Sequence, residues 1–92
     1  MTAPLVTLVA VDGSEPGLAA TRHAIALAGR GLALNIHLLN VQPALRSHVT
    51  GLVDEALVAD YHREAGEAAL AEAATLLTSA GLGLRLHIAV GE

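Results

Sequence analysis

An apolar segment that ends in Asp12-Gly13-Ser14 constrains the fold of this chain more than any other feature. Residues Leu5 to Val11 are apolar except for Thr7, without the alternation expected of a strand that has one solvated face. Such a run is typical of a strand buried on both faces within a parallel sheet. Asp12 would then stand at the carboxyl end of the strand, the end that faces the ligand crevice in open α/β sheets.

The residues after this strand indicate a tight turn and the start of a helix. Gly13 allows backbone conformations that a residue with a Cβ resists, and Ser14 is a preferred N-cap residue. Glu15 and Pro16 both suit the first turn of a helix. We therefore predict a helix from Glu15 to Gly29.

The rest of the chain extends the order to β-α-β-α-β. A second strand is predicted from Ala33 to Val41, with Gln42-Pro43 breaking it. After a loop or frayed helix start at Ala44 to Gly51, a second helix is predicted to reach about Ala80. A third strand is expected from Leu84 to Val90. Helical crossovers join parallel strands, so all three strands should be parallel.

Apolar periodicity predicts which side of each helix covers the sheet. In the first helix, Arg22, His23 and Arg30 are expected to point outward, and in the second the same holds for Glu64, Glu67 and Glu72. The core positions predicted for the first helix are Leu18, Ala19, Ile25, Ala26 and Ala28. Those predicted for the second helix are Val49, Leu52/Val53, Ala56/Leu57, Tyr61, Ala65, Ala68/Ala69, Ala73 and Leu76/Leu77.

Length and composition restrict the class of protein. Ninety-two residues predict one small domain, residues 1–92. The chain is 53% hydrophobic with Tyr61 as its one aromatic residue, so the core must be aliphatic. This apolar excess is consistent with a partner subunit.

Charge and cysteine content exclude several partners and locations. All five basic residues are scattered arginines, which argues against nucleic-acid binding. The chain has no cysteine, hence no disulfide framework, which fits a reducing cytoplasm. No apolar run approaches the roughly 20 residues of a membrane span, and no signal-peptide pattern is visible. We expect a cytoplasmic protein without membrane or nucleic-acid partners.

The opening block Leu5 to Pro16, together with His23 to Ala28 and the Leu-Leu-Asn-Val-Gln-Pro run at Leu38 to Pro43, resembles the universal stress protein family. The resemblance implies an adenine-nucleotide alpha-hydrolase-like fold whose full strand order is 3-2-1-4-5. Here it implies a truncated α/β domain with a three-stranded parallel sheet in the order 3-2-1. The family's segment Gly-x2-Gly-x9-Gly followed by Ser or Thr, which binds phosphate after strand four, has no counterpart in this sequence.

The resemblance also implies a candidate nucleotide site. In nucleotide-binding members, the residue that matches Asp12 contacts ribose or adenine, and the backbone that matches Val41 faces adenine. The other candidate residues are Ala10, Val11, Gly13 and Ser14. Some members bind ATP or AMP and others bind neither, and without the phosphate segment we expect weak binding or none.

Each of these residues also has a purely structural interpretation. Asp12 can cap the first helix and tie the turn together. Val41 can be a strand end packed in the core, and Ser14 can be a helix N-cap.

The sequence argues against catalysis by these residues. The Asp-Gly-Ser turn is similar to the Asp-x-Asp-Gly-Ser/Thr loop of haloacid-dehalogenase-type phosphatases, but Ala10 replaces the nucleophilic carboxylate. Ser14 lacks the Gly-x-Ser-x-Gly elbow of serine hydrolases. We therefore expect no catalytic residue.

The histidines suggest no metal centre. His37 and His87 lie on strands predicted to be adjacent and are expected to be neighbours. A zinc site needs three or four convergent ligands, however, and His62 with Glu67 does not form a His-Glu-x-x-His pattern. We expect no bound metal.

Three functional hypotheses follow. The first is a non-catalytic stress-response or signalling module that forms a homodimer through the exposed edge of the strand Leu5 to Val11, with the edge of the third strand as the alternative seam. The second is a slow ATP hydrolase. The third is a half-domain that only completes a partner's sheet.

Overall fold

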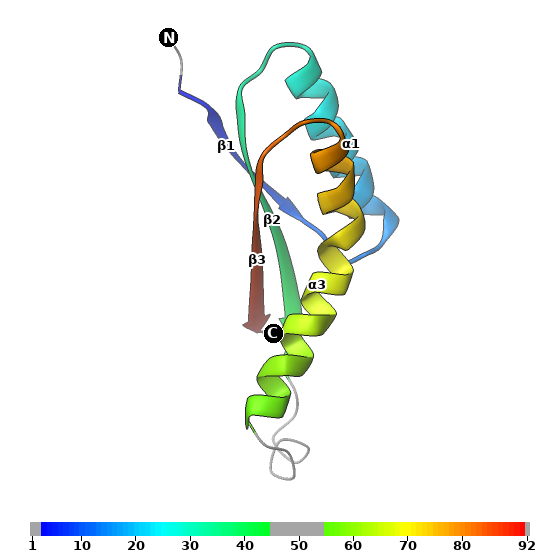
Figure 1. The fold of residues 1–92 in the computed structure, drawn as a ribbon, viewed down its shortest axis with the longest axis vertical. Helices are drawn as coiled ribbons and strands as arrows, with labels where there is room; N and C mark the ends of the chain where they lie inside the picture. The colour runs from blue at the N-terminus through cyan, green and yellow to red at the C-terminus, as the bar shows by residue number, and fades with distance from the viewer. Residues whose placement is uncertain (1–2, 45–54, 92) are drawn as a thin grey trace.

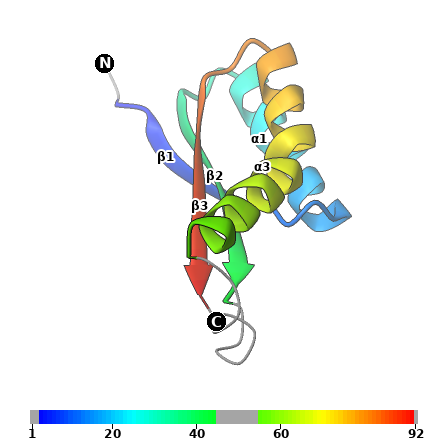
Figure 2. The ribbon, with the colours of Figure 1, turned by 60° about the horizontal axis from the view of Figure 1, so that its bottom comes forward.

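The two helices of the described residues lie on one face of a three-stranded parallel sheet (Figures 1 and 2). The computed structural model describes residues 3–44 and 55–91. Both strand pairs are parallel and the order is β1-β2-β3, as predicted. The elements are β1 (Leu5–Ala10), α1 (Glu15–Gly29), β2 (Leu34–Pro43), α3 (Glu55–Ser79) and β3 (Leu84–Gly91).

The register of the sheet decides which side chains face the helices. β1 pairs with β2 from Leu5↔Leu34 to Ala10↔Leu39, and β2 pairs with β3 from Ile36↔Leu84 to Pro43↔Gly91. Successive side chains of a strand alternate between the two faces. One face therefore packs under α1 and α3 and forms the core. The buried apolar residues of this core are Val9, Val11, Leu18, Ala24, Ile36, Leu38, Leu70, Ala73 and Leu77.

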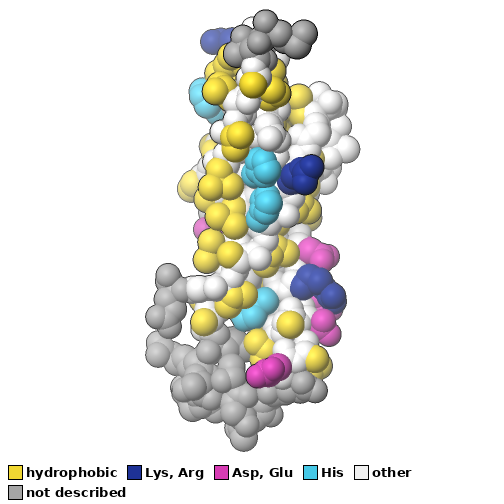
Figure 3. All heavy atoms as spheres, turned by 90° about the vertical axis from the view of Figure 1, so that its left-hand side faces the viewer, with side chains coloured by type: hydrophobic (Ala, Val, Ile, Leu, Met, Phe, Trp, Pro, Cys, Tyr) yellow, Lys and Arg dark blue, Asp and Glu magenta, His cyan; other side chains and the backbone are white. Residues whose placement is uncertain are grey.

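The opposite face, here called the open face, is not covered by a helix of the described chain (Figure 3). Val6 and Leu8 on β1 are 74% and 64% exposed, and Val41 on β2 is 52% exposed. The prediction that the first strand is buried on both faces is therefore wrong. An apolar run shows that both faces of a strand could be buried. Here both described helices lie on the same face of the sheet, so the other face is exposed.

β2 is longer than predicted. Gln42 and Pro43 do not break it, because both still pair with β3. The carbonyl oxygen of Leu39 accepts a 2.8 Å hydrogen bond from the backbone N–H of Val11, the residue that follows β1. By alternation, the backbone nitrogen of Pro43 points to the same side, beyond the end of β1. The missing N–H of proline therefore costs no ladder hydrogen bond at this position.

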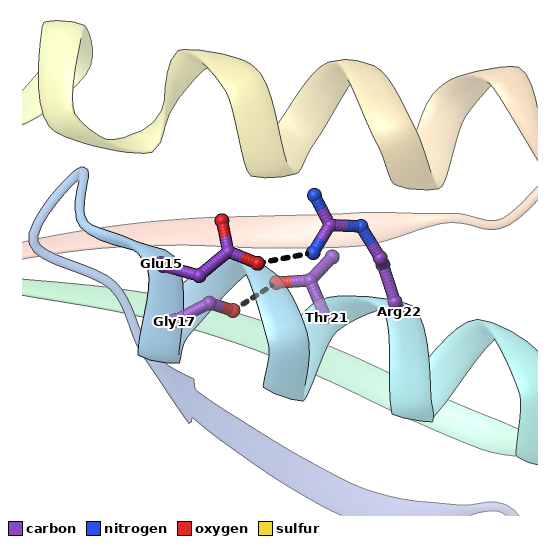
Figure 4. Close-up of polar contacts among 4 residues, drawn as sticks. All are labelled: Glu15, Gly17, Thr21 and Arg22. Atoms are coloured by element: carbon purple, nitrogen blue, oxygen red, sulfur yellow. Dashed lines mark hydrogen bonds and ion pairs between the residues drawn. The ribbon is translucent and has the colours of Figure 1, made fainter.

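α1 has the predicted bounds but a different buried side. Leu18 is buried as expected, whereas Ala19 and Ala26 are exposed and Thr21 is buried instead. The Thr21 hydroxyl donates to the carbonyl oxygen of Gly17 at 2.8 Å, which satisfies the buried polar group (Figure 4).

The outward side of α1 is as predicted. Arg22, His23 and Arg30 are exposed. Arg22 forms a 2.7 Å ion pair with Glu15 (Figure 4). Because both side chains are exposed, the pair contributes at most about 1 kcal/mol.

The buried side of α3 is rotated by one residue from the predicted stripe over its first half. Leu57 and Tyr61 are 61% and 55% exposed, and His62 and Gly66 are buried. The helix approaches β3 so closely at Gly66 that an added Cβ would lie 2.7–2.8 Å from three carbons of Ile88.

The second half of α3 matches the prediction better. Ala73 and Leu77 are buried, and Glu64, Glu67 and Glu72 are exposed. The loop predicted at 44–51 and the stripe positions Val49, Leu52 and Val53 lie, apart from residue 44, outside the described residues. Among the described helices, none combines the length and hydrophobicity that a membrane crossing requires.

Candidate functional site

A pocket of about 250 Å³ opens at the carboxyl end of β1, where the chain turns into α1. It brings together five of the six residues predicted as a site and leaves Gly13 outside its lining. Gly13 supplies the turn instead, with a φ of +89° that a residue with a side chain rarely adopts. The lining residues are Ala10, Val11, Asp12, Ser14, Pro16, Gly17, Leu39 and Val41.

Asp12 is the charged group of this pocket. Its Oδ1 accepts a 2.9 Å hydrogen bond from the backbone N–H of Ser14 and a second one from the Ser14 hydroxyl. The hydroxyl bond, followed by the backbone bond, lowers the pKa of Asp12 below its ordinary value. Asp12 is therefore an ionised hydrogen-bond acceptor at neutral pH, and it is exposed to solvent.

Ser14 does not cap α1 with its side chain, contrary to the structural interpretation of this residue. It holds the N-cap position with extended backbone angles, but its hydroxyl makes no capping bond. That hydroxyl is turned back to Asp12. The turn is thus tied together by Asp12 and Ser14, and this part of the structural interpretation of Asp12 holds.

Gly17 lets α1 begin directly against the end of β1. A Cβ at this position would lie 3.0 Å from the carbonyl oxygen of Ala10 and 3.0 Å from the Cα of Val11. Both are backbone atoms, which cannot move aside as a flexible side chain can. Gly17 therefore shapes the pocket, and no sequence pattern singled it out.

Asn40 on β2 supports the pocket through a hydrogen bond to Val11, one of the lining residues. Its side-chain amide donates to the carbonyl oxygen of Val11 at 2.8 Å, and its Oδ1 accepts from Nε2 of Gln42 at 2.5 Å. Asn40 is 2% exposed and shares the core face of β2 with Ile36 and Leu38. A buried polar residue in the apolar alternation of β2 is the signal that could have identified it.

The lining favours a ligand with an apolar face and hydroxyl or amino donors. Ala10, Leu39 and Val41 provide apolar surface, and the carboxylate of Asp12 accepts hydrogen bonds. No Lys, Arg or His belongs to the lining, so the described residues offer no cation to a phosphate group. In the described part of the chain, no three His, Asp or Glu side chains are grouped to hold a metal ion.

His37 and His87 are neighbours, as predicted, on the open face of the sheet. Nδ1 of His37 lies 2.8 Å from Nε2 of His87, and the rings stack with their centroids 5.0 Å apart. The two ring nitrogens are within hydrogen-bond distance, and which of them donates depends on the tautomers of the two rings. Neither ring lines the Asp12 pocket.

Comparison with known proteins points to one family. A model of the universal stress protein family matches residues 6–92. A crystal structure of a protein from the universal stress protein family of Burkholderia pseudomallei is 25% identical in sequence and similar in fold, with a TM-score of 0.67. The similarity covers 92% of this chain and 61% of that one, so the chain spans less than two thirds of its structural neighbour. A search of the curated proteins found no match.

Proposed function

The chain belongs to the universal stress protein family, and from that premise we propose that it is a non-catalytic stress-response or signalling module that binds adenine nucleosides and nucleotides weakly. One observation carries the proposal: ionised Asp12 stands beside apolar side chains in a pocket at the carboxyl end of a parallel sheet. This is the edge at which open α/β sheets bind ligands.

The chemistry of the pocket suits the nucleoside part of the ligand. Asp12 accepts a hydrogen bond from a ribose hydroxyl or an adenine amino group, and the apolar wall of Leu39 and Val41 contacts the base. A volume of about 250 Å³ is somewhat below the usual range of small-molecule sites, which begins at roughly 300 Å³. The pocket therefore holds a fragment the size of a nucleoside better than a whole triphosphate.

The phosphates contribute little to this binding. The described lining has no cationic side chain, and the negative charge of Asp12 repels an anion. We expect adenosine and AMP to bind at least as well as ATP. A pocket built for a triphosphate would show the opposite order.

Slow ATP hydrolysis is the competing function, and the described residues give it less support. Phosphoryl transfer needs groups that hold the phosphates and position a water molecule. The Ser14 hydroxyl is engaged with Asp12, and the lining has no histidine to act as its base. We expect no phosphate release above background in a malachite-green assay with magnesium or manganese. Turnover that persists through purification and disappears in Asp12→Ala would establish the enzyme instead.

Calorimetric titration with adenosine, AMP and ATP tests the nucleoside site. Asp12→Ala should weaken binding of all three ligands, whereas Asp60→Ala, at an exposed aspartate on α3, should leave it unchanged. Circular dichroism verifies that both variants remain folded. Equal affinity of Asp12→Ala and the wild type would refute the site. No binding by the wild type at millimolar ligand would favour the third hypothesis, a half-domain that only completes a partner's sheet.

A further inference from the structure

A second pocket lies between the first half of α3 and the carboxyl end of β3, which run side by side in Figures 1 and 2. It shares no lining residue with the Asp12 pocket. Its lining residues are Ala59, His62 and Arg63 on one side of α3, and Ile88 and Val90 on β3. β3 is an outer strand here and also in the order 3-2-1-4-5, so this side of the sheet gains no further strand in a longer domain of that order.

The contact between Gly66 and Ile88 bounds this pocket on one side. An added Cβ at Gly66 would lie 2.7–2.8 Å from three carbons of Ile88, so helix and strand touch at this turn. His62 precedes Gly66 by four residues and therefore lies on the same side of α3. Before that turn the helix leaves a space of about 310 Å³ beside Ile88 and Val90. The space thus results from the way α3 crosses β3.

His62 is the unusual polar residue of the lining. It is 6% exposed, and its Nδ1 is buried without a hydrogen-bond partner among the described residues. The ring packs edge-on against Tyr61 with centroids 5.4 Å apart, which is a ring contact rather than a hydrogen bond. Buried polar atoms in proteins almost always have a hydrogen-bond partner. An unpartnered imidazole in the wall of a pocket therefore points to a bound group that supplies the missing hydrogen bond.

Arg63 is the cation of the lining. Its Nη2 lies 3.3 Å from Oδ1 of Asp60, and its Nε lies 3.9 Å from Oε1 of Glu67. Both ion pairs are long and exposed, so they hold the guanidinium weakly. A carboxylate can therefore pair with the guanidinium through two parallel hydrogen bonds. Asp60 and Glu67 together carry more negative charge than Arg63 balances, so they repel a dianion such as a phosphate more than a monoanion.

We propose that this pocket binds a small monocarboxylate with an apolar body. The carboxylate pairs with Arg63 and accepts a hydrogen bond from the imidazole of His62. The apolar body packs against Ala59, Ile88 and Val90. The volume of about 310 Å³ is within the usual range of small-molecule sites, roughly 300–1,000 Å³. This ligand is independent of the nucleoside proposed for the other pocket.

Benzoate is the probe, because it combines a flat apolar ring with one carboxylate. In a titration followed by NMR, benzoate should shift the backbone amide signals of residues 59–63 and 88–90 and the imidazole nitrogen signals of His62. The imidazole of His23, exposed on α1, should not respond. Benzamide has the same shape without the charge, and phenylphosphonate adds a second negative charge at mildly alkaline pH, so both should bind more weakly.

Three outcomes of this titration would overturn the proposal. The first is equal affinity for benzoate and benzamide, which would make the charge irrelevant. The second is a set of shifts that excludes His62 and the residues of β3. The third is the absence of any shift at millimolar benzoate.

Two substitutions test the walls of the pocket. Arg63→Gln should weaken benzoate binding by about fivefold, as expected for the loss of one partly exposed charge pair, and should leave benzamide binding unchanged. Arg22→Gln is the matched control, because the side chains of Arg22 and Arg63 are 53% and 60% exposed and both are ion-paired. Ala59→Leu, at an exposed helix position, fills the pocket and should abolish binding.

Circular dichroism verifies that these variants remain folded. Unchanged benzoate affinity in Arg63→Gln or in Ala59→Leu would overturn the proposal, as would an equal loss in Arg22→Gln. Asp12→Ala should bind benzoate like the wild type. Loss of benzoate binding in Asp12→Ala would place the ligand in the other pocket and refute this one.

Discussion

The side-chain amide of Asn40 donates a 2.8 Å hydrogen bond to the backbone carbonyl of Val11, the residue before Asp12. This bond ties β2 to the point where the chain leaves the sheet and turns to α1. Both residues are 2% exposed, so water has little access to replace the bond. The position of the Asp12 carboxylate therefore depends on a buried amide one strand away.

Asn40→Ala should destabilise the fold by about 1–3 kcal/mol, because it leaves the buried carbonyl of Val11 without a partner. Adenosine affinity should fall as well, since the turn at Asp12 is no longer held. Urea unfolding and calorimetry measure the two effects. Asn35→Ala, at an exposed position of the same strand, should change stability by less than about 0.5 kcal/mol. Equal stability of the two variants would show that the amide bond is not needed.

Ser14→Ala should raise the pKa of Asp12 toward its ordinary value, because the hydroxyl bond is the main cause of the lowered pKa. The backbone bond from residue 14 remains. Carboxyl chemical shifts followed by NMR across acidic pH give the value directly. Ser79→Ala, at the end of α3, should leave the pKa of Asp12 unchanged. An unchanged pKa of Asp12 in Ser14→Ala would show that the hydroxyl bond is not the main cause of the lowered pKa.

The lowered pKa of Asp12 determines the direction in which the stability of the fold changes with pH. A carboxyl whose pKa is lower in the folded state stabilises the fold above its unfolded pKa, and this contribution is lost as pH falls through the folded pKa. Stability of the wild type should therefore decrease as the pH falls from the ordinary aspartate pKa to the lower folded pKa. Ser14→Ala should lose less in that window. Thermal unfolding of both proteins at several pH values measures the difference.

Gly66→Ala should destabilise the protein although alanine favours helices over glycine by about 1 kcal/mol. The new methyl group would overlap three carbons of Ile88, and such overpacking costs about 1–3 kcal/mol. In an Ile88→Ala background the same change should become neutral or stabilising. Gly29→Ala in α1, where no atom lies within 4 Å of an added Cβ, is the control and should not destabilise. Additive effects of Gly66→Ala and Ile88→Ala would contradict this contact.

Gly17→Ala should lower both stability and adenosine affinity. Its methyl group would press on the backbone of Ala10 and Val11, so α1 must move away from the end of β1. We expect a loss of about 1–3 kcal/mol in unfolding free energy together with weaker calorimetric binding. If adenosine affinity is unchanged while stability falls, the first turn of α1 does not form part of the site.

The sequence indicated the fold well because its signals were local. The apolar run before Asp12, together with Gly13 and Pro16, predicted β1, the turn and the first residue of α1. The same stretch contains Ala10, Val11, Asp12 and Ser14 of the pocket lining, and the family resemblance added Val41. The parallel direction of the strands followed from the helical crossovers, and their order followed from the family resemblance.

The sequence did not indicate features that depend on packing between distant segments. The hydropathy pattern cannot show that Gly66 packs against Ile88. It also placed Leu57 and Tyr61 in the predicted core, although both are exposed. Nor does an apolar strand reveal which of its faces a helix covers: both faces of β1 are apolar, and in the described chain the face with Val6 and Leu8 is exposed. Gly17 was missed because its importance lies in a contact that only the folded backbone shows.

The sheet register has a consequence for the order in which the protein folds. The first β1–β2 pair joins residues 5 and 34, which are 29 positions apart, and the first β2–β3 pair joins residues 36 and 84, which are 48 apart. Closing the longer loop costs about 0.4 kcal/mol more chain entropy. Loop closure alone therefore favours the pairing of β1 with β2, the pairing that brackets the turn with Asp12, over the pairing of β2 with β3.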